Sequence, residues 1–298
     1  MTTRIYVLLA RKAATALVFR RGPTKNVLLL RWDLTEDTIQ EGQWLRGHIY
    51  ERRCDLSPSG EHLVYFAAKW RGKYPSFTAV SRPPFLTALA LWEGMGAWGG
   101  GGTFSDERTL MINHRLVGKP DEGGLAPKMS ASPFHAHSGK GEDFPIWDER
   151  LRRDGWTLKQ WGGWSARSLS GVEADIAGER TKVWAKIDPP IIYRRVLEHA
   201  TIEMRIHGLH ETNGPWYALE HDVLDSRGNT IMSLGRADWA DFDRRGDLLF
   251  AKSGRIYRAT RHKSTFDDPR ELFDLRAHRF TQRPSPPWAR QWLSKRPA

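Results

Sequence analysis

The chain of 298 residues contains a single cysteine, Cys54, so it forms no internal disulfide. No segment approaches the run of roughly 20 apolar residues that a membrane helix needs. The apolar residues 4–10 are too few for a secretory signal, and Arg11 and Lys12 follow them directly. We therefore expect a cytoplasmic protein with no membrane partner.

Complete catalytic motifs are also missing. There is no Gly-x-Ser-x-Gly elbow and no His-Glu-x-x-His pair. Four consecutive glycines, Gly99 to Gly102, resemble part of a phosphate-binding loop, but no Lys-Ser/Thr follows them. We expect this run to serve tight packing or a flexible loop, and a backbone cradle for phosphate is the alternative. No cofactor motif is present, so we expect no cofactor.

A nine-residue pattern that occurs four times is the main positive signal. It reads x, apolar, Ser or Asp, x, x, usually Gly, x, x, apolar, and each copy predicts a strand, a tight turn and a second strand. The copies span 55–63, 103–111, 223–231 and 241–249.

The residue types at the turn explain this prediction. Ser57 or Asp243 accepts a hydrogen bond from a backbone N–H two residues on, and Pro58 presets the next φ angle. Gly60 then takes the left-handed conformation that a bulged hairpin needs. The second copy has Arg108 at the glycine position, so it departs most from the pattern.

The spacing of the copies predicts the larger architecture. The first two copies begin about 48 residues apart, and the interval from 103 to 241 is about three times 46 residues. Short strands at this period are typical of β-propeller blades. We interpret the copies at 223 and 241 as two hairpins of one blade. The fold expected is all-β, a single propeller of about five to seven four-stranded blades.

Two of the copies also resemble a known family. Residues 54–67 are similar to the core of WD40-like, TolB-type propeller repeats, and residues 241–251 are similar to it as well. Ser59 replaces the usual Asp of that core, and Arg244 and Arg245 replace Pro-Asp. The resemblance implies an architecture, and propellers of this kind serve as protein-binding platforms, as accessory domains, or less often as hydrolases.

Two segments depart from the strand rhythm. Residues 118–145 are poor in apolar side chains and rich in Gly, Pro and Ser, which predicts a loop insertion. We assign 1–282 to the propeller and 283–298 to a basic tail containing Pro and Trp. From 276 to 298 the sequence has only basic charged residues.

Charge and tryptophan content permit a binding role, and a solvated Arg-rich surface is the alternative explanation of the charge. The net charge is +11 and there are 14 Trp residues. Most Trp are expected between blades, while a minority form a recognition surface with Arg. The binding residues predicted in this way are Trp92, Trp98, Arg283, Trp288, Arg290, Trp292, Lys295 and Arg296.

Histidine clusters provide the candidates for chemistry. His207, His210 and Glu211 would form a general-base or metal site at a channel mouth, and hydrogen-bonded structural residues are the alternative. His135 and His137, with Asp143 nearby, are the metal-binding candidates, against a solvated loop.

Three functions follow from these observations. The leading hypothesis is a non-catalytic propeller that binds another macromolecule, most readily a protein, through its Trp- and Arg-rich loops. The second is contact with nucleic acid through the basic rim and tail. The third is a hydrolase or lyase with a His/Glu site.

Overall fold

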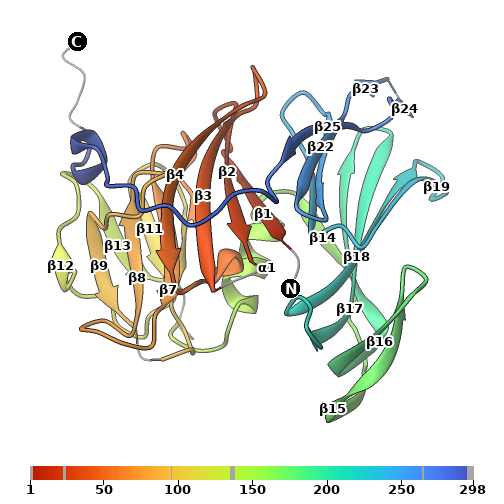
Figure 1. Cartoon of the computed structure of the whole chain (residues 1–298), viewed down its shortest axis with the longest axis horizontal. Helices are drawn as coiled ribbons and strands as arrows, with labels where there is room; N and C mark the ends of the chain where they lie inside the picture. The colour runs from red at the N-terminus through yellow and green to blue at the C-terminus, as the bar shows by residue number, and fades with distance from the viewer. Residues whose placement is uncertain (1–2, 23–24, 95, 135–137, 264, 294–298) are drawn as a thin grey trace. The chain divides into compact units, whose positions relative to one another are not determined.

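The computed structural model describes residues 3–22, 25–94, 96–134, 138–263 and 265–293, which belong to two compact units. Unit 1 comprises Met1–Ile5 and Leu151–Ala277, and unit 2 comprises Tyr6–Arg150 and His278–Ala298. Strands dominate both, and the described residues contain one α-helix, α1 (Phe144–Arg153) (Figure 1). The predicted all-β class is confirmed.

The first sheet of the chain, sheet A, is a four-stranded antiparallel meander. Its two central strands are apolar almost throughout, because both of their faces are buried. In β3, Val27 to Leu30 are all buried. The strands, in spatial order, are β1 (Arg4–Leu9), β2 (Thr15–Arg21), β3 (Asn26–Asp33) and β4 (Thr38–Arg46).

Sheets B and C complete the strands of unit 2. Sheet B runs β12-β9-β8-β7-β5, and β6 also pairs with β7; sheet C runs β10-β11-β13. Sheet B consists of β5 (His48–Ile49), β6 (Asp55–Leu56), β7 (Leu63–Ala68), β8 (Ser76–Ser81), β9 (Ala90–Glu93) and β12 (Glu122–Gly123). Sheet C consists of β10 (Gly102–Phe104), β11 (Thr109–Ile112) and β13 (Ser130–Pro133). Strands β12 and β13 and the start of α1 thus lie inside the segment 118–145 that the sequence predicted as a loop insertion.

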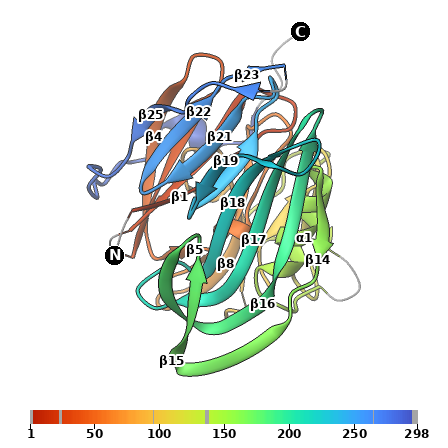
Figure 2. The same cartoon turned by 90° about the vertical axis from the view of Figure 1, so that its right-hand side faces the viewer.

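Unit 1 is built around sheet D, whose strands are the longest in the described chain. Its order is β14-β16-β17-β18-β19, and β15 pairs with the first half of β16. Its strands are β14 (Trp156–Gln160), β15 (Trp164–Ile176), β16 (Glu179–Leu197), β17 (Ala200–Glu211), β18 (Tyr217–Asp225) and β19 (Thr230–Gly235). The β15–β16 hairpin extends beyond the rest of this sheet (Figure 2).

Two smaller sheets follow in unit 1. Sheet E is a four-stranded antiparallel sheet of β20 (Trp239–Phe242), β21 (Leu248–Lys252), β22 (Arg255–Ala259) and β25 (Arg270–Asp274). The pair of β23 (Arg261–His262) and β24 (Thr265–Phe266) stands between β22 and β25 in the sequence.

All four copies of the nine-residue pattern form the predicted hairpins. They correspond to β6–β7, β10–β11, β18–β19 and β20–β21. In the last copy, Asp243 Oδ1 accepts the N–H groups of Arg245 and Asp247, and Gly246 has a φ of 85°. In the second copy Asp106 takes over this role, because Arg108 replaces the glycine and the turn closes differently.

The interpretation of the copies at 223 and 241 as one blade is wrong. The first hairpin lies in sheet D and the second in sheet E. The chain changes direction between the two hairpins at Gly235, which has a φ of 55°. The Ala237 N–H donates to Gly235 O in this turn.

No sheet closes on itself within the described ranges, and the arrangement of the sheets around a common axis stays a prediction. The division at residue 282 into propeller and tail also stays a prediction. Among the described residues, no helix has both the length and the apolar character needed to cross a membrane.

Candidate functional site

Of the three metal-ligand candidates, only Asp143 falls in the described part of the chain. His135 and His137 lie outside the described residues. Asp143 is held by Arg53, whose Nε donates to Asp143 Oδ1 at 2.6 Å in a buried ion pair. Among the described residues, no three His, Cys, Asp or Glu side chains are grouped so that they could hold a metal ion.

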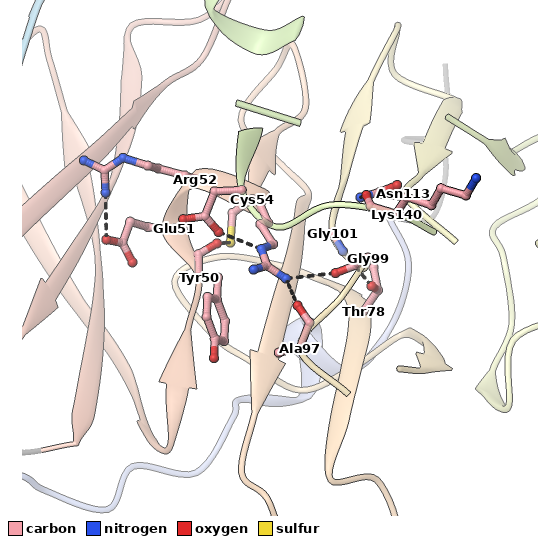
Figure 3. A network of polar contacts seen from close by, with 12 residues as sticks. Tyr50, Glu51, Arg52, Cys54, Thr78, Ala97, Gly99, Gly101, Asn113 and Lys140 are labelled. Atoms are coloured by element: carbon pink, nitrogen blue, oxygen red, sulfur yellow. Dashed lines mark hydrogen bonds and ion pairs between the residues drawn. The ribbon is translucent and has the colours of Figure 1, made fainter. Parts of the chain in front are cut away.

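Arg53 is also the centre of a buried polar network in unit 2, whose members Tyr50, Ala97 and Gly99 are labelled in Figure 3. Its Nη1 donates to the backbone oxygens of Ala97 at 2.5 Å and Gly99 at 2.9 Å. The ring of Tyr50 lies 4.6 Å from its guanidinium carbon. A buried charge is tolerated only when it is paired and hydrogen-bonded, and this guanidinium meets both conditions.

The glycine run beside Arg53 serves packing rather than phosphate binding. The N–H groups of Gly99, Gly100 and Gly101 donate to Gly141 O, Asn113 O and Thr78 Oγ1. These three glycines have positive φ angles, and a Cβ on Gly100 would approach the Phe66 ring to 2.3 Å. Their amides are therefore committed to the protein, and glycine is required by space and by backbone conformation.

Cys54 has no nucleophilic character in this setting. Its thiol is fully buried and hydrogen-bonded to Tyr50 O at 3.1 Å. Burial raises the pKa of the thiol far above its ordinary value, and the nearby Arg150 only partly opposes this. The neutral thiol is the stable form, which is the behaviour of a small core residue.

The proposed catalytic histidines lie on β17 but do not converge. His207 Nε2 is 3.0 Å from Glu220 Oε2, whereas the His210 ring stacks on Trp216 with centroids 5.2 Å apart. Glu211 accepts hydrogen bonds from Thr181 Oγ1 and from Arg236.

The electrostatics of His207 follow from its surroundings. Burial lowers the pKa of His207, and the Glu220 carboxylate opposes this by Coulombic attraction and a hydrogen bond. Arg205 binds the same carboxylate, together with Glu203 and Asp222, so this face of sheet D carries a network in which one guanidinium bridges three carboxylates. Glu220 orients the neutral His207 ring as a carboxylate orients a catalytic base. The surrounding Arg205 ion pairs, however, join neighbouring strands and stabilise the sheet.

The tail residues that the structure describes lie along unit 2. We call residues 278–293 the C-terminal strap; it runs across sheet A in Figure 1. Arg283 Nη1 donates to Glu41 O, and Arg290 Nε donates to Ser285 O. Trp288 packs edge-on against Phe85 at 5.3 Å.

The end of the strap covers a buried histidine. Trp292 donates from Nε1 to Gly124 O at 2.8 Å, and its ring lies 5.1 Å from that of His62. His62 is 8% exposed, and neither of its ring nitrogens has a hydrogen-bond partner. Burial, reinforced by Arg82, lowers the pKa of His62 to about 4.

The other predicted binding residues have different environments. Trp92 is buried in the core of unit 2 and donates from Nε1 to Gly118 O, so it offers little surface to a partner. Trp98 is 66% exposed. Lys295 and Arg296 lie outside the described residues.

A group that the sequence did not identify lies on sheet D. We call it the aromatic row; it consists of Trp164, Arg167, Trp184, His210 and Trp216. The Arg167 guanidinium carbon is 4.8 Å from the Trp164 ring centroid and 5.8 Å from that of Trp184.

Strand pairing extends this group towards β18. The register pairs Val183 with Glu211 and Ala185 with Leu209, which places Trp184 across from His210, whose ring stacks on Trp216. Its members are up to 52 positions apart in sequence, so only the strand register reveals them as neighbours.

Comparison with known proteins adds no family to this description. No protein-family model matches the chain, and no curated protein is significantly similar to it.

Proposed function

We propose that the protein is a non-catalytic binding protein whose sheets are blades of a β-propeller. It binds another macromolecule through exposed tryptophan and arginine side chains. The observation that carries this proposal is the aromatic row, which leaves Trp164 and Trp216 substantially exposed on sheet D. Clusters of exposed aromatic side chains mark interaction sites, and Trp and Arg dominate binding energy at interfaces.

The strand pattern supports the propeller part of the proposal. Sheets A and E are four-stranded antiparallel sheets with neighbouring strands in chain order, which is the make-up of a propeller blade. The hairpins β6–β7 and β20–β21 carry the sequences that resemble propeller repeats.

The surroundings of the candidate catalytic groups support a binding role over an enzymatic one. His207 is bound to Glu220, Glu211 to Arg236, Asp143 to Arg53, and the Cys54 thiol is buried. Each group has a stabilising role that explains its position without a substrate.

An affinity capture with matched baits tests the proposal. The intact chain and two variants, Trp164→Ala/Trp184→Ala and Trp70→Ala, are immobilised and exposed to lysate of the source organism. We expect a ligand that is retained by the intact chain and by Trp70→Ala but lost from the double variant. Equal recovery on all three baits, or turnover of a substrate that His207→Ala abolishes, would overturn the proposal.

The tail offers less support for nucleic-acid contact than the sequence predicted. In the described part of the strap, Arg283 holds the strap on Glu41 of unit 2, and Arg290 donates to Ser285 O within the strap. The cytoplasmic location remains a prediction.

A further inference from the structure

The aromatic row crosses four strands of sheet D obliquely, because Trp164 pairs with Ile187, three positions along β16 from Trp184. Trp164 and Arg167 come from β15, Trp184 from β16, His210 from β17, and Trp216 directly precedes β18. Neighbouring strands lie about 4.8 Å apart, so the row spans roughly 15 Å over four strands. That length is suited to several consecutive units of a linear ligand rather than to one small molecule.

The rings are also presented to solvent. Trp164 is 53% exposed and Trp216 is 41% exposed, and His210 between them is exposed as well. Trp184 is half-buried, and the planar Arg167 guanidinium stacks between it and Trp164. The row therefore presents aromatic rings with one planar guanidinium between two of them.

The charged side chains near the aromatic row indicate which class of linear ligand would stack on it. Arg167 and Lys186 lie at the row, while the more distant Lys182 and Arg180 are paired across the strands with Glu173 and Asp175. Lys186 also contacts the exposed Asp188 at 3.3 Å. With Arg167 and Lys186 beside the aromatic rings, this surface favours a polyanion with flat, stackable groups.

We propose that the aromatic row binds single-stranded nucleic acid, whose bases stack on Trp164, Trp184 and Trp216 while Arg167 and Lys186 meet the phosphates. This inference rests on the proposed binding function and names its ligand class. Base stacking on aromatic and guanidinium planes tolerates any sequence, so the expected preference is for single strands over duplex rather than for a particular sequence.

The number of basic side chains at the aromatic row determines how strongly salt weakens the binding of nucleic acid. Only two basic side chains at the row lack a cross-strand carboxylate directly opposite, so about two phosphates are neutralised. For single strands the slope of log K against log salt is then about −1.4. A complex held only by ion pairs between phosphates and the basic C-terminal tail would show a much steeper slope.

Fluorescence anisotropy with a labelled 12-nucleotide oligo(dT) and the full chain tests this inference. We expect saturable binding, a shallow salt slope, and a ten- to hundredfold weaker affinity for Trp164→Ala/Trp184→Ala. The matched control is Trp70→Ala, which removes an equally exposed tryptophan from unit 2 and leaves the affinity within about twofold. Circular dichroism and thermal unfolding verify that each variant is folded.

Two results would overturn the inference. One is no binding of oligo(dT) or of the matching oligo(U) by the intact chain at 50 mM salt, and the other is equal affinity of the folded double variant. If, instead, the capture experiment yields a protein that depends on Trp164 and Trp184, the ligand class is wrong and the binding function stands. If neither ligand depends on these residues, both proposals fail.

Discussion

Replacing His62 by Phe should make the stability of the protein less sensitive to acid. The His62 ring is buried beneath Trp292, neither ring nitrogen is hydrogen-bonded, and Arg82 repels a proton there. Phe keeps a flat ring of similar size against the indole, and it removes both the buried nitrogens and the titration.

The expected magnitude follows from the pKa. The pKa of histidine is about 6.5 in the unfolded chain, and that of His62 falls to about 4 in the folded protein. Between these values the unfolded state binds more protons, so the free energy of unfolding falls as the pH falls. The loss is about 2 kcal/mol at pH 5 and approaches about 3 kcal/mol below pH 4.

Urea unfolding followed by tryptophan fluorescence between pH 7.5 and pH 5 measures this loss. The quantity of interest is the difference in free energy of unfolding between His62→Phe and the wild-type chain, because groups common to both proteins cancel. We expect this difference to grow by about 2 kcal/mol in favour of the variant as the pH falls to 5. Parallel pH profiles would refute the reasoning, and His199→Gln, at an exposed position, is the control.

Three further substitutions test other parts of the description. Arg258→Met leaves the buried carboxylates of the Asp243 turn without their cation, so chemical denaturation should show a loss of about 3–5 kcal/mol. Gly100→Ala forces a Cβ into the Phe66 ring at a positive φ angle and should cost about 1–3 kcal/mol, whereas Gly118→Ala meets open space and should be close to neutral. Trp288→Ala removes an aromatic pair with Phe85 and a cation–π contact with Arg82, together worth about 1–2 kcal/mol. Trypsin should therefore cleave the strap roughly tenfold faster in the variant, and an unchanged cleavage rate would contradict the packing described.

The hairpins were predictable because their determinants are local. Asp225 and Asp243 accept the backbone N–H groups of their own turns, and Gly228 and Gly246 take the positive φ angles that the pattern required. Such contacts join residues two to four positions apart, so the sequence contains all the information needed.

The association of hairpins into sheets was less predictable. The segment from β15 to β17 contains register shifts after Arg167 and Lys186, and each shift changes which side chains become neighbours. The aromatic row depends on that register, so composition indicated many tryptophans without indicating which of them gather on one surface.

The sequence also did not indicate which charged side chains are buried. A net charge of +11 suggests a basic surface, yet Arg20, Arg53, Arg150 and Arg258 are buried among carboxylates, carbonyls and rings. Arg150, for example, donates to the backbone oxygen of Cys54 and to the Tyr6 hydroxyl. The charge composition therefore overstates how many cations are offered to a polyanion.

The C-terminal strap has a consequence for synthesis on the ribosome. It binds residues such as Gln43 and Arg82 that emerge more than two hundred positions earlier, while residues 151–277 form most of the other unit. His62 in the nascent N-terminal sheets therefore stays uncovered until the strap has been synthesised, whereas residues 151–277 are made before it. A premature stop near residue 277 would release a chain in which only that unit has all its parts.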